Sequence, residues 1–208
     1  MKIKKINIDF NKIRQDKKKM YVLIAICAVI LLFIIFLLTI FFTHTSNSKE
    51  VEFFIRPKDN YSVVRDKLIK EKVIKSHSFT FNVLSKVLSY KSCVKEGRYV
   101  IKPHTSILRM IYRLRNGNQT PVKIVITNAR SVDDLAKEVT KNLMMSKEDF
   151  INEVNKQGYT YPTELFFSVV PDTYQAYWTI TPKKMLNKLK EASDKFWQDK
   201  QETLQKSG

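Results

Sequence analysis

Residues 21–42 read YVLIAICAVILLFIIFLLTIFF, a run with no charged residue, glycine or proline. As an α-helix that rises ~1.5 Å per residue, this run is long enough to cross the ~30 Å hydrocarbon core of a bilayer. It exceeds the ~7–15 apolar residues of a secretory signal peptide, and no cleavage pattern of small residues follows it. The run therefore predicts a transmembrane signal anchor at residues 21–42, with a buried core helix as the alternative.

The residues on either side of this run predict its orientation. Residues 1–20 carry eight lysines and arginines against two aspartates, and Lys17-Lys18-Lys19 lies at the edge of the apolar run. Because positive flanks stay in the cytoplasm, we expect residues 1–20 to form a cytoplasmic basic tail. The chain is thus predicted to be a single-pass protein of the plasma (inner) membrane. The residues after 43 are then expected to lie outside the cytoplasm. Residues 43–50 are short and polar, and they are predicted to be a linker.

Charge and cysteine content limit the classes of partner. The 208-residue chain has a formal net charge of +17, which in a cytoplasmic protein favours nucleic acid. The expected topology places the basic domain away from nucleic acid, so anionic wall polymers or lipid headgroups are the expected partners, and a merely solvated basic surface is the alternative. Cys27 lies in the apolar run and Cys93 outside it, so they cannot pair within one chain. The three histidines lack the spacing of metal ligands.

The residues after the linker predict strand, helix, helix and strand in succession. Residues 51–56 and 96–101 are rich in β-prone side chains and are strand candidates. Two helices are predicted between them, the first capped by Ser62 and the second by Ser76 or Ser78. The apolar positions expected to face the core are Val63, Val64, Leu68 and Ile69 in the first helix, and Phe79, Val83, Val87 and Leu88 in the second.

The same pattern continues further along the chain. A helix that starts near Ser106 is predicted to end at Gly117, and residues 121–127 form a strand candidate. Ser131 and Ser146 then have the positions of helix N-caps. Strand, turn and two capped helices thus occur twice, which is a faint internal repeat. The fold class predicted from these elements is α+β.

Residues 160–180, TYPTELFFSVVPDTYQAYWTI, concentrate aromatic side chains beside carboxylates, as sugar-binding grooves do. Tyr174, Tyr177 and Trp178 are candidates to cover the apolar face of a pyranose; the alternative is that they are core residues that seal a sheet against helices. Glu164 lies in an apolar setting, which favours the protonated form that a general acid needs. Asp172 is the second carboxylate of this region, and a turn or capping role is its alternative.

Four segments in this order resemble a known family. They are Lys95-Glu-Gly-Arg-Tyr-Val-Ile101, the helix of residues 106–117, Val122-Lys-Ile-Val-Ile126 with the helix after Ser131, and Pro171-Asp-Thr-Tyr174. Together they resemble the motifs of endolytic murein transglycosylases, the MltG/YceG-like family. The sequence departs from that pattern at residues 166–170, which lack the Glu and Gly that often precede Pro-Asp-Thr-Tyr. The A-S-I-x-E-x-E context of the family's catalytic Glu is absent from the sequence.

The resemblance implies a fold, a reaction and a substrate. Residues 51–103 would be a LysM-like module and residues 104–208 the incomplete start of a catalytic domain. Such enzymes cut MurNAc–GlcNAc bonds within nascent glycan strands without a cofactor. One Glu protonates the leaving oxygen and then deprotonates the C6 hydroxyl, which closes a 1,6-anhydro ring and terminates strand elongation.

The resemblance assigns no catalytic residue to this chain. The expected Glu lies beyond Gly208, so the fragment itself is predicted to be inactive. Asp172, Tyr174, Tyr177 and Trp178 remain candidates for substrate binding. The expected partners are glycan strands, the membrane and peptidoglycan synthases, and not nucleic acid. The alternative function is that of a non-catalytic, bitopic cell-wall-binding or division scaffold protein.

Overall fold

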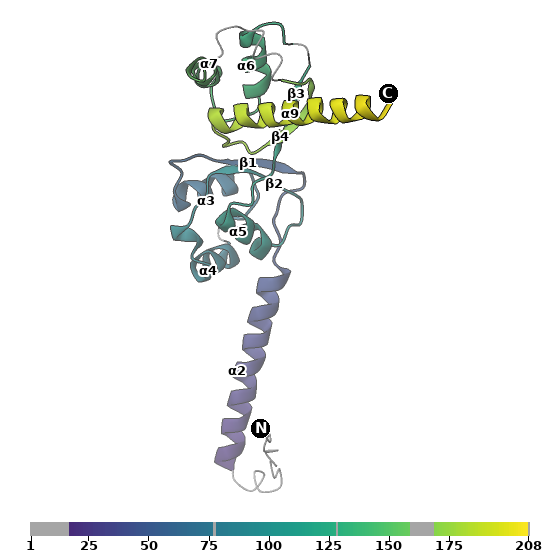
Figure 1. Cartoon of the computed structure of the whole chain (residues 1–208). Coiled ribbons are helices and arrows are strands. Elements are labelled where there is room, and N and C mark those ends of the chain that lie inside the picture. The colour runs from purple at the N-terminus through teal and green to yellow at the C-terminus, as the bar shows by residue number, and fades with distance from the viewer. Residues whose placement is uncertain (1–16, 77, 128, 159–168, 208) are drawn as a thin grey trace.

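The computed structural model describes residues 17–76, 78–127, 129–158 and 169–207, and it shows a long N-terminal helix followed by two small modules (Figure 1). Helix α2 spans Lys17–Phe42. Among the described residues, one helix is long and apolar enough to cross a membrane, and it is this one. Its apolar side chains are exposed, with Leu32 at 66% and Val29 at 65%. The alternative of a buried core helix is therefore wrong.

The first module is a two-stranded antiparallel sheet packed against three α-helices. Its elements are β1 (Val51–Ile55), α3 (Tyr61–Lys70), α4 (Phe79–Val87), the 3-10 turn η1 (Tyr90–Ser92), β2 (Gly97–Ile101) and α5 (Ile107–Asn116). In the sheet, Val51 lies opposite Ile101 and Ile55 opposite Gly97. Alternate residues of a strand point to the same face, so Phe53 and Ile55 are both buried. The predicted order of strand, helix, helix and strand is confirmed.

Helix α5 completes the core of this first module. Ile107, Met110, Ile111 and Leu114 belong to the same buried cluster as the inward residues of β1 and β2. The helix ends where the sequence predicted, because Gly117 adopts the left-handed conformation with φ of 72°. The first core therefore reaches past residue 103 and includes the helix that follows β2.

The second module repeats this order of elements. It contains β3 (Val122–Ile126), α6 (Val132–Thr140), α7 (Lys147–Lys156), β4 (Asp172–Ala176) and α9 (Pro182–Ser207). β3 and β4 are antiparallel, with Val122 opposite Ala176. Met185, Leu186 and Leu189 of α9 are buried in one cluster with residues of α6 and α7. Beyond Ser193 the helix extends away from the module (Figure 1).

The predicted caps of the second module are confirmed. The Ser131 hydroxyl accepts a hydrogen bond from the Asp134 amide at 3.0 Å. The Ser146 hydroxyl likewise accepts from the Asp149 amide at 3.0 Å, and the Asp149 carboxylate accepts from the Ser146 amide at 3.1 Å. This reciprocal pair is the capping box that the sequence indicated.

Three details of the first module differ from the prediction. Val63, which was expected to face the core, is 38% exposed. Asn60, not Ser62, caps α3, since its side-chain oxygen accepts from the Val63 amide at 3.0 Å. In α4, which Ser78 caps, the predicted inward face is wrong: Phe79 and Val87 are 68% and 71% exposed. The residues that α4 buries are Phe81, Leu84 and Ser85. Both sides of this helix carry apolar residues, and the side with Phe81 and Leu84 packs into the core.

The residues between α2 and β1 are bonded into the first module. The Thr45 amide donates to the Thr105 carbonyl and the Ser46 amide to the Val73 carbonyl, both at 2.8 Å. The Asn47 side chain donates to the Ile101 carbonyl at 3.1 Å. Thr45 and Asn47 are each 4% exposed. Successive hydrogen bonds thus fix the start of this segment to the module.

Candidate functional site

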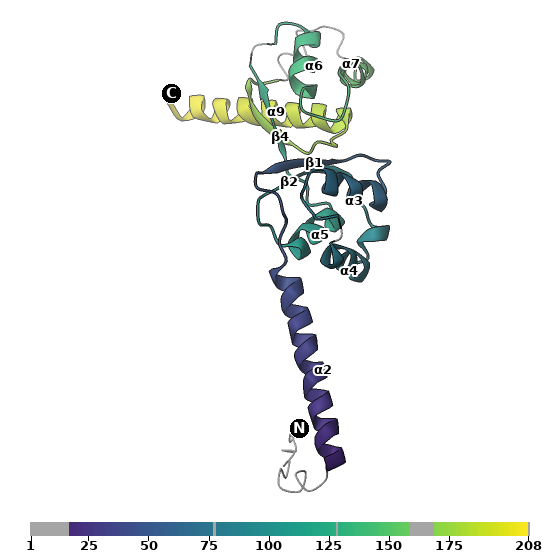
Figure 2. The ribbon, with the colours of Figure 1, turned by 180° about the vertical axis from the view of Figure 1, so that it is seen from behind.

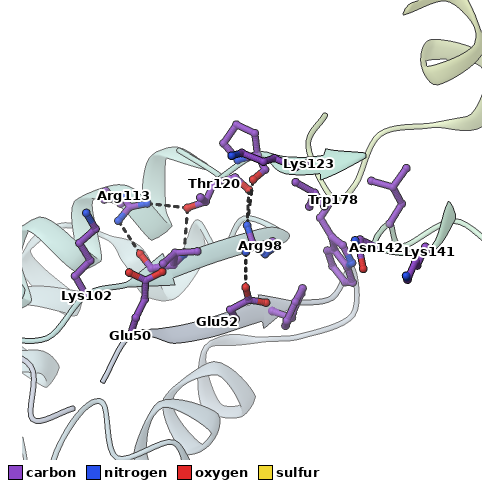
Figure 3. Close-up of a pocket in the computed structure, with 15 residues that line it drawn as sticks. Glu50, Glu52, Arg98, Lys102, Arg113, Thr120, Lys123, Lys141, Asn142 and Trp178 are labelled. Carbon is purple, nitrogen blue, oxygen red and sulfur yellow. Dashed lines mark hydrogen bonds and ion pairs between the residues drawn. The ribbon is translucent and has the colours of Figure 1, made fainter. Parts of the chain in front are cut away.

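A groove of about 870 Å³ lies between the two modules (Figure 3). Its walls come from β1, β2 and α5 on one side, and from β3, the residues after α6 and the residues after β4 on the other. The polar lining residues are Glu50, Glu52, Arg98, Lys102, Arg113, Thr120, Lys123, Lys141 and Asn142. The groove is therefore predominantly basic.

Thr120 fixes the backbone at the point where the chain passes from one module to the next. Its amide donates to the Arg98 carbonyl at 2.7 Å, and its hydroxyl accepts from the Val100 amide at 3.1 Å. The Arg113 guanidinium donates to the same hydroxyl at 3.2 Å. The connecting segment thus continues the hydrogen bonding of β2 and forms a fixed wall of the groove.

Two guanidinium groups of the groove are committed to the protein itself. Arg98 forms an ion pair with Glu52 at 2.5 Å and donates to the Pro121 carbonyl at 3.1 Å. Arg113 donates to the Val100 carbonyl at 3.1 Å. These contacts orient both side chains and leave less of their hydrogen-bonding capacity for a ligand.

Three lysines supply the available positive charge. Lys102, Lys123 and Lys141 are exposed, and within the part of the chain that the structure describes their ammonium groups form no ion pair. Lys102 lies at one end of the groove and Lys141 at the other (Figure 3). An extended anionic ligand along the groove would meet a positive charge at both ends.

Trp178 and Phe54 form the aromatic part of the groove. Their ring centroids lie 5.1 Å apart with an interplanar angle of 61°, an edge-to-face pair that joins the two modules. Trp178 is 9% exposed and Phe54 36%. Beside them, the Gln119 side chain donates to the Thr179 hydroxyl at 3.0 Å, which is a second contact between the modules.

The structure separates the four residues predicted to bind substrate. Trp178 lines the groove, whereas Tyr177 is 55% exposed and is not among the lining residues. Tyr174 is 6% exposed in β4, and its hydroxyl donates to the Val170 carbonyl at 2.5 Å. Burial, reinforced by the nearby charge of Asp172, raises the pKa of Tyr174. That placement matches the alternative of a core residue that seals the sheet.

Asp172 occupies the exposed first position of β4, and its carboxylate accepts a hydrogen bond from the Thr173 amide at 2.6 Å. The bond reaches only the next amide and Asp172 is the first residue of a strand, so it shows neither an Asx turn nor a helix cap. Glu164 lies outside the described residues. The carboxylates that do line the groove are Glu50 and Glu52, of which Glu52 is paired with Arg98.

The basic lining of the groove was not predicted from the sequence. The alternation of β3 does place Lys123 and Val125 on the outer face of the strand. No local pattern, however, links Lys123 to Lys102 and Lys141, which the packing of two modules brings to one groove. Among the described residues no cluster of His, Cys, Asp and Glu could hold a metal ion.

Comparison with known proteins tests the resemblance. No curated protein matches the chain. A solved structure, that of a yceG-like protein from Listeria monocytogenes, is similar with 16% identity and a TM-score of 0.37. The match covers 77% of this chain and 59% of that one, so the chain spans less than two thirds of the length of its structural neighbour. Residues 53–208 match the model of the YceG-like family, and the chain therefore belongs to that family, as its motifs indicated.

Proposed function

We propose that this chain is the membrane anchor and strand-binding part of an endolytic peptidoglycan lytic transglycosylase. The observation that carries the proposal is the family match over residues 53–208. The proposed reaction is cleavage of MurNAc–GlcNAc bonds within nascent strands, which leaves 1,6-anhydro-MurNAc ends and stops strand growth. The groove between the modules is the proposed site at which a glycan strand binds.

The chemistry of the groove suits this ligand. Peptidoglycan carries carboxylates on its lactyl groups and peptide stems, and Lys102, Lys123 and Lys141 offer ammonium groups to them. Trp178 and Phe54 supply the apolar surface that the C–H face of a sugar ring requires. A strand that lies along the groove would contact aromatic rings near Trp178 and positive charge at both ends.

The proposed location follows from α2. We propose that α2 crosses the plasma membrane once, with Lys17–Lys19 on the cytoplasmic side and both modules outside. An enzyme held in this way works on strands as they leave the membrane-bound synthases. The LysM-like character of the first module belongs to the same proposal.

Muropeptide analysis by mass spectrometry tests the reaction. Purified peptidoglycan is incubated with this chain and, in parallel, with the product of the complete reading frame wherever that extends past Gly208. We expect anhydro-MurNAc ends from the longer product and none from this chain, because the sequence lacks the A-S-I-x-E-x-E context. Anhydro ends from this chain would mean that a carboxylate within it is the acid. None from either would refute the enzyme and favour the wall-binding scaffold.

Co-sedimentation with purified cell-wall sacculi tests the groove. Replacing Lys102, Lys123 and Lys141 with Glu should abolish most binding, and binding of the unaltered chain should weaken as salt screens the charges. The matched control changes the exposed α9 residues Lys183, Lys188 and Lys190 to Glu, which alters the net charge equally away from the groove. Equal losses from both variants would show that only overall charge matters and that the groove is not the site.

A further inference from the structure

Helix α4 carries two apolar faces, and only one of them is buried. Phe81 and Leu84 are 1% and 5% exposed and form part of the first core. Phe79, Val83 and Val87, each four residues from the next, follow the other side of the helix. Phe79 and Val87 are 68% and 71% exposed, and Val83 is partly buried. We name this side, with Lys86, the outer face of α4.

The outer face lies at the end of the first module that adjoins α2. Figures 1 and 2 both show α4 at that edge of the module, with β1 and β2 at the opposite edge. The Thr43 hydroxyl, one residue past the end of α2, is 3.4 Å from the Thr80 hydroxyl of α4. The Thr43 carbonyl also accepts from the Ile107 amide at 3.0 Å. The end of α2 and the start of α4 are thus held side by side.

Bilayer dimensions give this contact a consequence. The polar interfacial layer on each side of the ~30 Å hydrocarbon core is roughly 5–8 Å thick. The apolar run of α2 ends at Phe42. If α2 crosses the bilayer, the next residue, Thr43, therefore lies within the interfacial layer. Thr80 is in contact with Thr43, and a helix with side chains is about 10 Å across. If Thr43 lies within the interfacial layer, the start of α4 lies within that layer or directly beside it.

The charge of the surrounding segment suits such a position. Between Lys72 and Lys95 the sequence contains no Asp or Glu. Lys86 is exposed and lies next to Phe79 in the helical projection, at one edge of the outer face. Helices that lie in a membrane interface combine apolar side chains that enter the acyl boundary with lysines that reach headgroup phosphates. The outer face of α4 has both kinds of residue.

We propose that the outer face of α4 is a second membrane contact, which rests in the headgroup layer of the bilayer that α2 crosses. The inference rests on the membrane anchor put forward under the proposed function. With α2 it gives the first module two points of attachment to the lipid surface. A single helix would leave the module free to rotate about the axis of that helix. Two attachments fix the tilt of the module relative to the membrane.

Depth-dependent fluorescence quenching tests this contact. The whole chain, with Cys27 and Cys93 replaced by Ser, is reconstituted into vesicles of phosphatidylcholine and phosphatidylglycerol. Single cysteines introduced by Phe79→Cys or Val87→Cys carry an environment-sensitive dye. Val125→Cys, at a 55% exposed valine of β3, is the matched control, and Leu32→Cys reports on α2 itself. Because the labelled side chains are exposed, circular dichroism of each variant should match that of the parent.

Nitroxide lipids that carry the quencher near the headgroup should quench the dyes of the Phe79→Cys and Val87→Cys variants at least about twofold more than the Val125→Cys dye. Lipids with a deep nitroxide should quench the Leu32→Cys dye. Quenching of the Leu32→Cys dye alone would overturn the α4 contact and leave the anchor intact. No quenching at any position would overturn the anchor as well. A blue shift of the α4 dyes without lipid quenching would mean that protein covers the face, and it would also refute the proposal.

Discussion

Truncation of Trp178 should loosen the junction between the two modules, and a double-mutant cycle with Phe54 measures how much. The two rings form the edge-to-face contact across the groove, with centroids 5.1 Å apart. Trp178 is 9% exposed, so Trp178→Ala should lower the free energy of unfolding by about 3–5 kcal/mol. Phe54 is 36% exposed, and Phe54→Ala should cost about 1–2 kcal/mol.

The interaction between the rings appears as the departure from additivity. An aromatic pair in this geometry is worth about 0.5–1.5 kcal/mol beyond the area that it buries. The double variant should therefore be less destabilised than the sum of the single variants by about that amount. Because the rings belong to different modules, this coupling measures how far one module supports the other.

Urea unfolding of the whole chain in detergent micelles, followed by far-ultraviolet circular dichroism, gives the four free energies. The matched control is a second cycle of Phe54→Ala with Tyr177→Ala, since Tyr177 is the aromatic neighbour of Trp178 and is 55% exposed. That control should be additive within about 0.5 kcal/mol. If the cycle of Phe54 with Trp178 is equally additive, the contact between the two rings does not help to hold the modules together.

Three further variants test individual contacts. Gly97→Ala should lower the melting temperature more than Gly158→Ala, although both glycines have positive φ. A Cβ at Gly97 would meet a glutamine side chain at 2.5 Å, whereas among the described residues nothing lies within 4 Å of a Cβ placed at Gly158. Hydrogen bonds with Ser146 hold the pKa of Asp149 below 3.8. The stability that the ionised Asp149 contributes is therefore present above about pH 4 and is lost as pH falls through the lowered pKa. Ser146→Ala should make this loss of stability at low pH smaller. Burial raises the pKa of Tyr99 to about 12 from 10.0. The stability that the buried, neutral phenol contributes is therefore complete below about pH 10 and is lost as pH rises toward about 12. Tyr99→Phe should reduce this loss of stability at alkaline pH, measured from melting temperatures.

Elements that local chemistry determines were predictable from the sequence. Gly117 ends its helix because glycine tolerates the left-handed conformation, and Ser146 starts one because its hydroxyl reaches an amide three residues on. The apolar run of α2 can be recognised from its own residues, without knowledge of what they contact. In each case the residues that decide the structure are neighbours in the chain.

Features that depend on distant residues were not predictable in the same way. Helix α4 has apolar residues on both sides, and periodicity cannot tell which of Phe79 and Phe81 will meet the core. Trp178 was a candidate because of its residue type, yet its partner Phe54 comes from the other module. The lysines of the groove meet only because the connection at Thr120 follows the edge of β2.

The hydrogen bonds after α2 relate the proposed anchor to the proposed site. Thr45 and Asn47 are buried in the first module, so the helix does not lead into a free tether. The Asn47 side chain bonds to Ile101, the last residue of β2, and β2 supplies Arg98 and Val100 to the groove. Hydrogen bonds therefore attach the segment after the helix to β2, a strand that forms part of the wall of the groove. If α2 crosses the membrane, the thickness of the first module sets the height of the groove above the bilayer, and a bound strand would be held at that height.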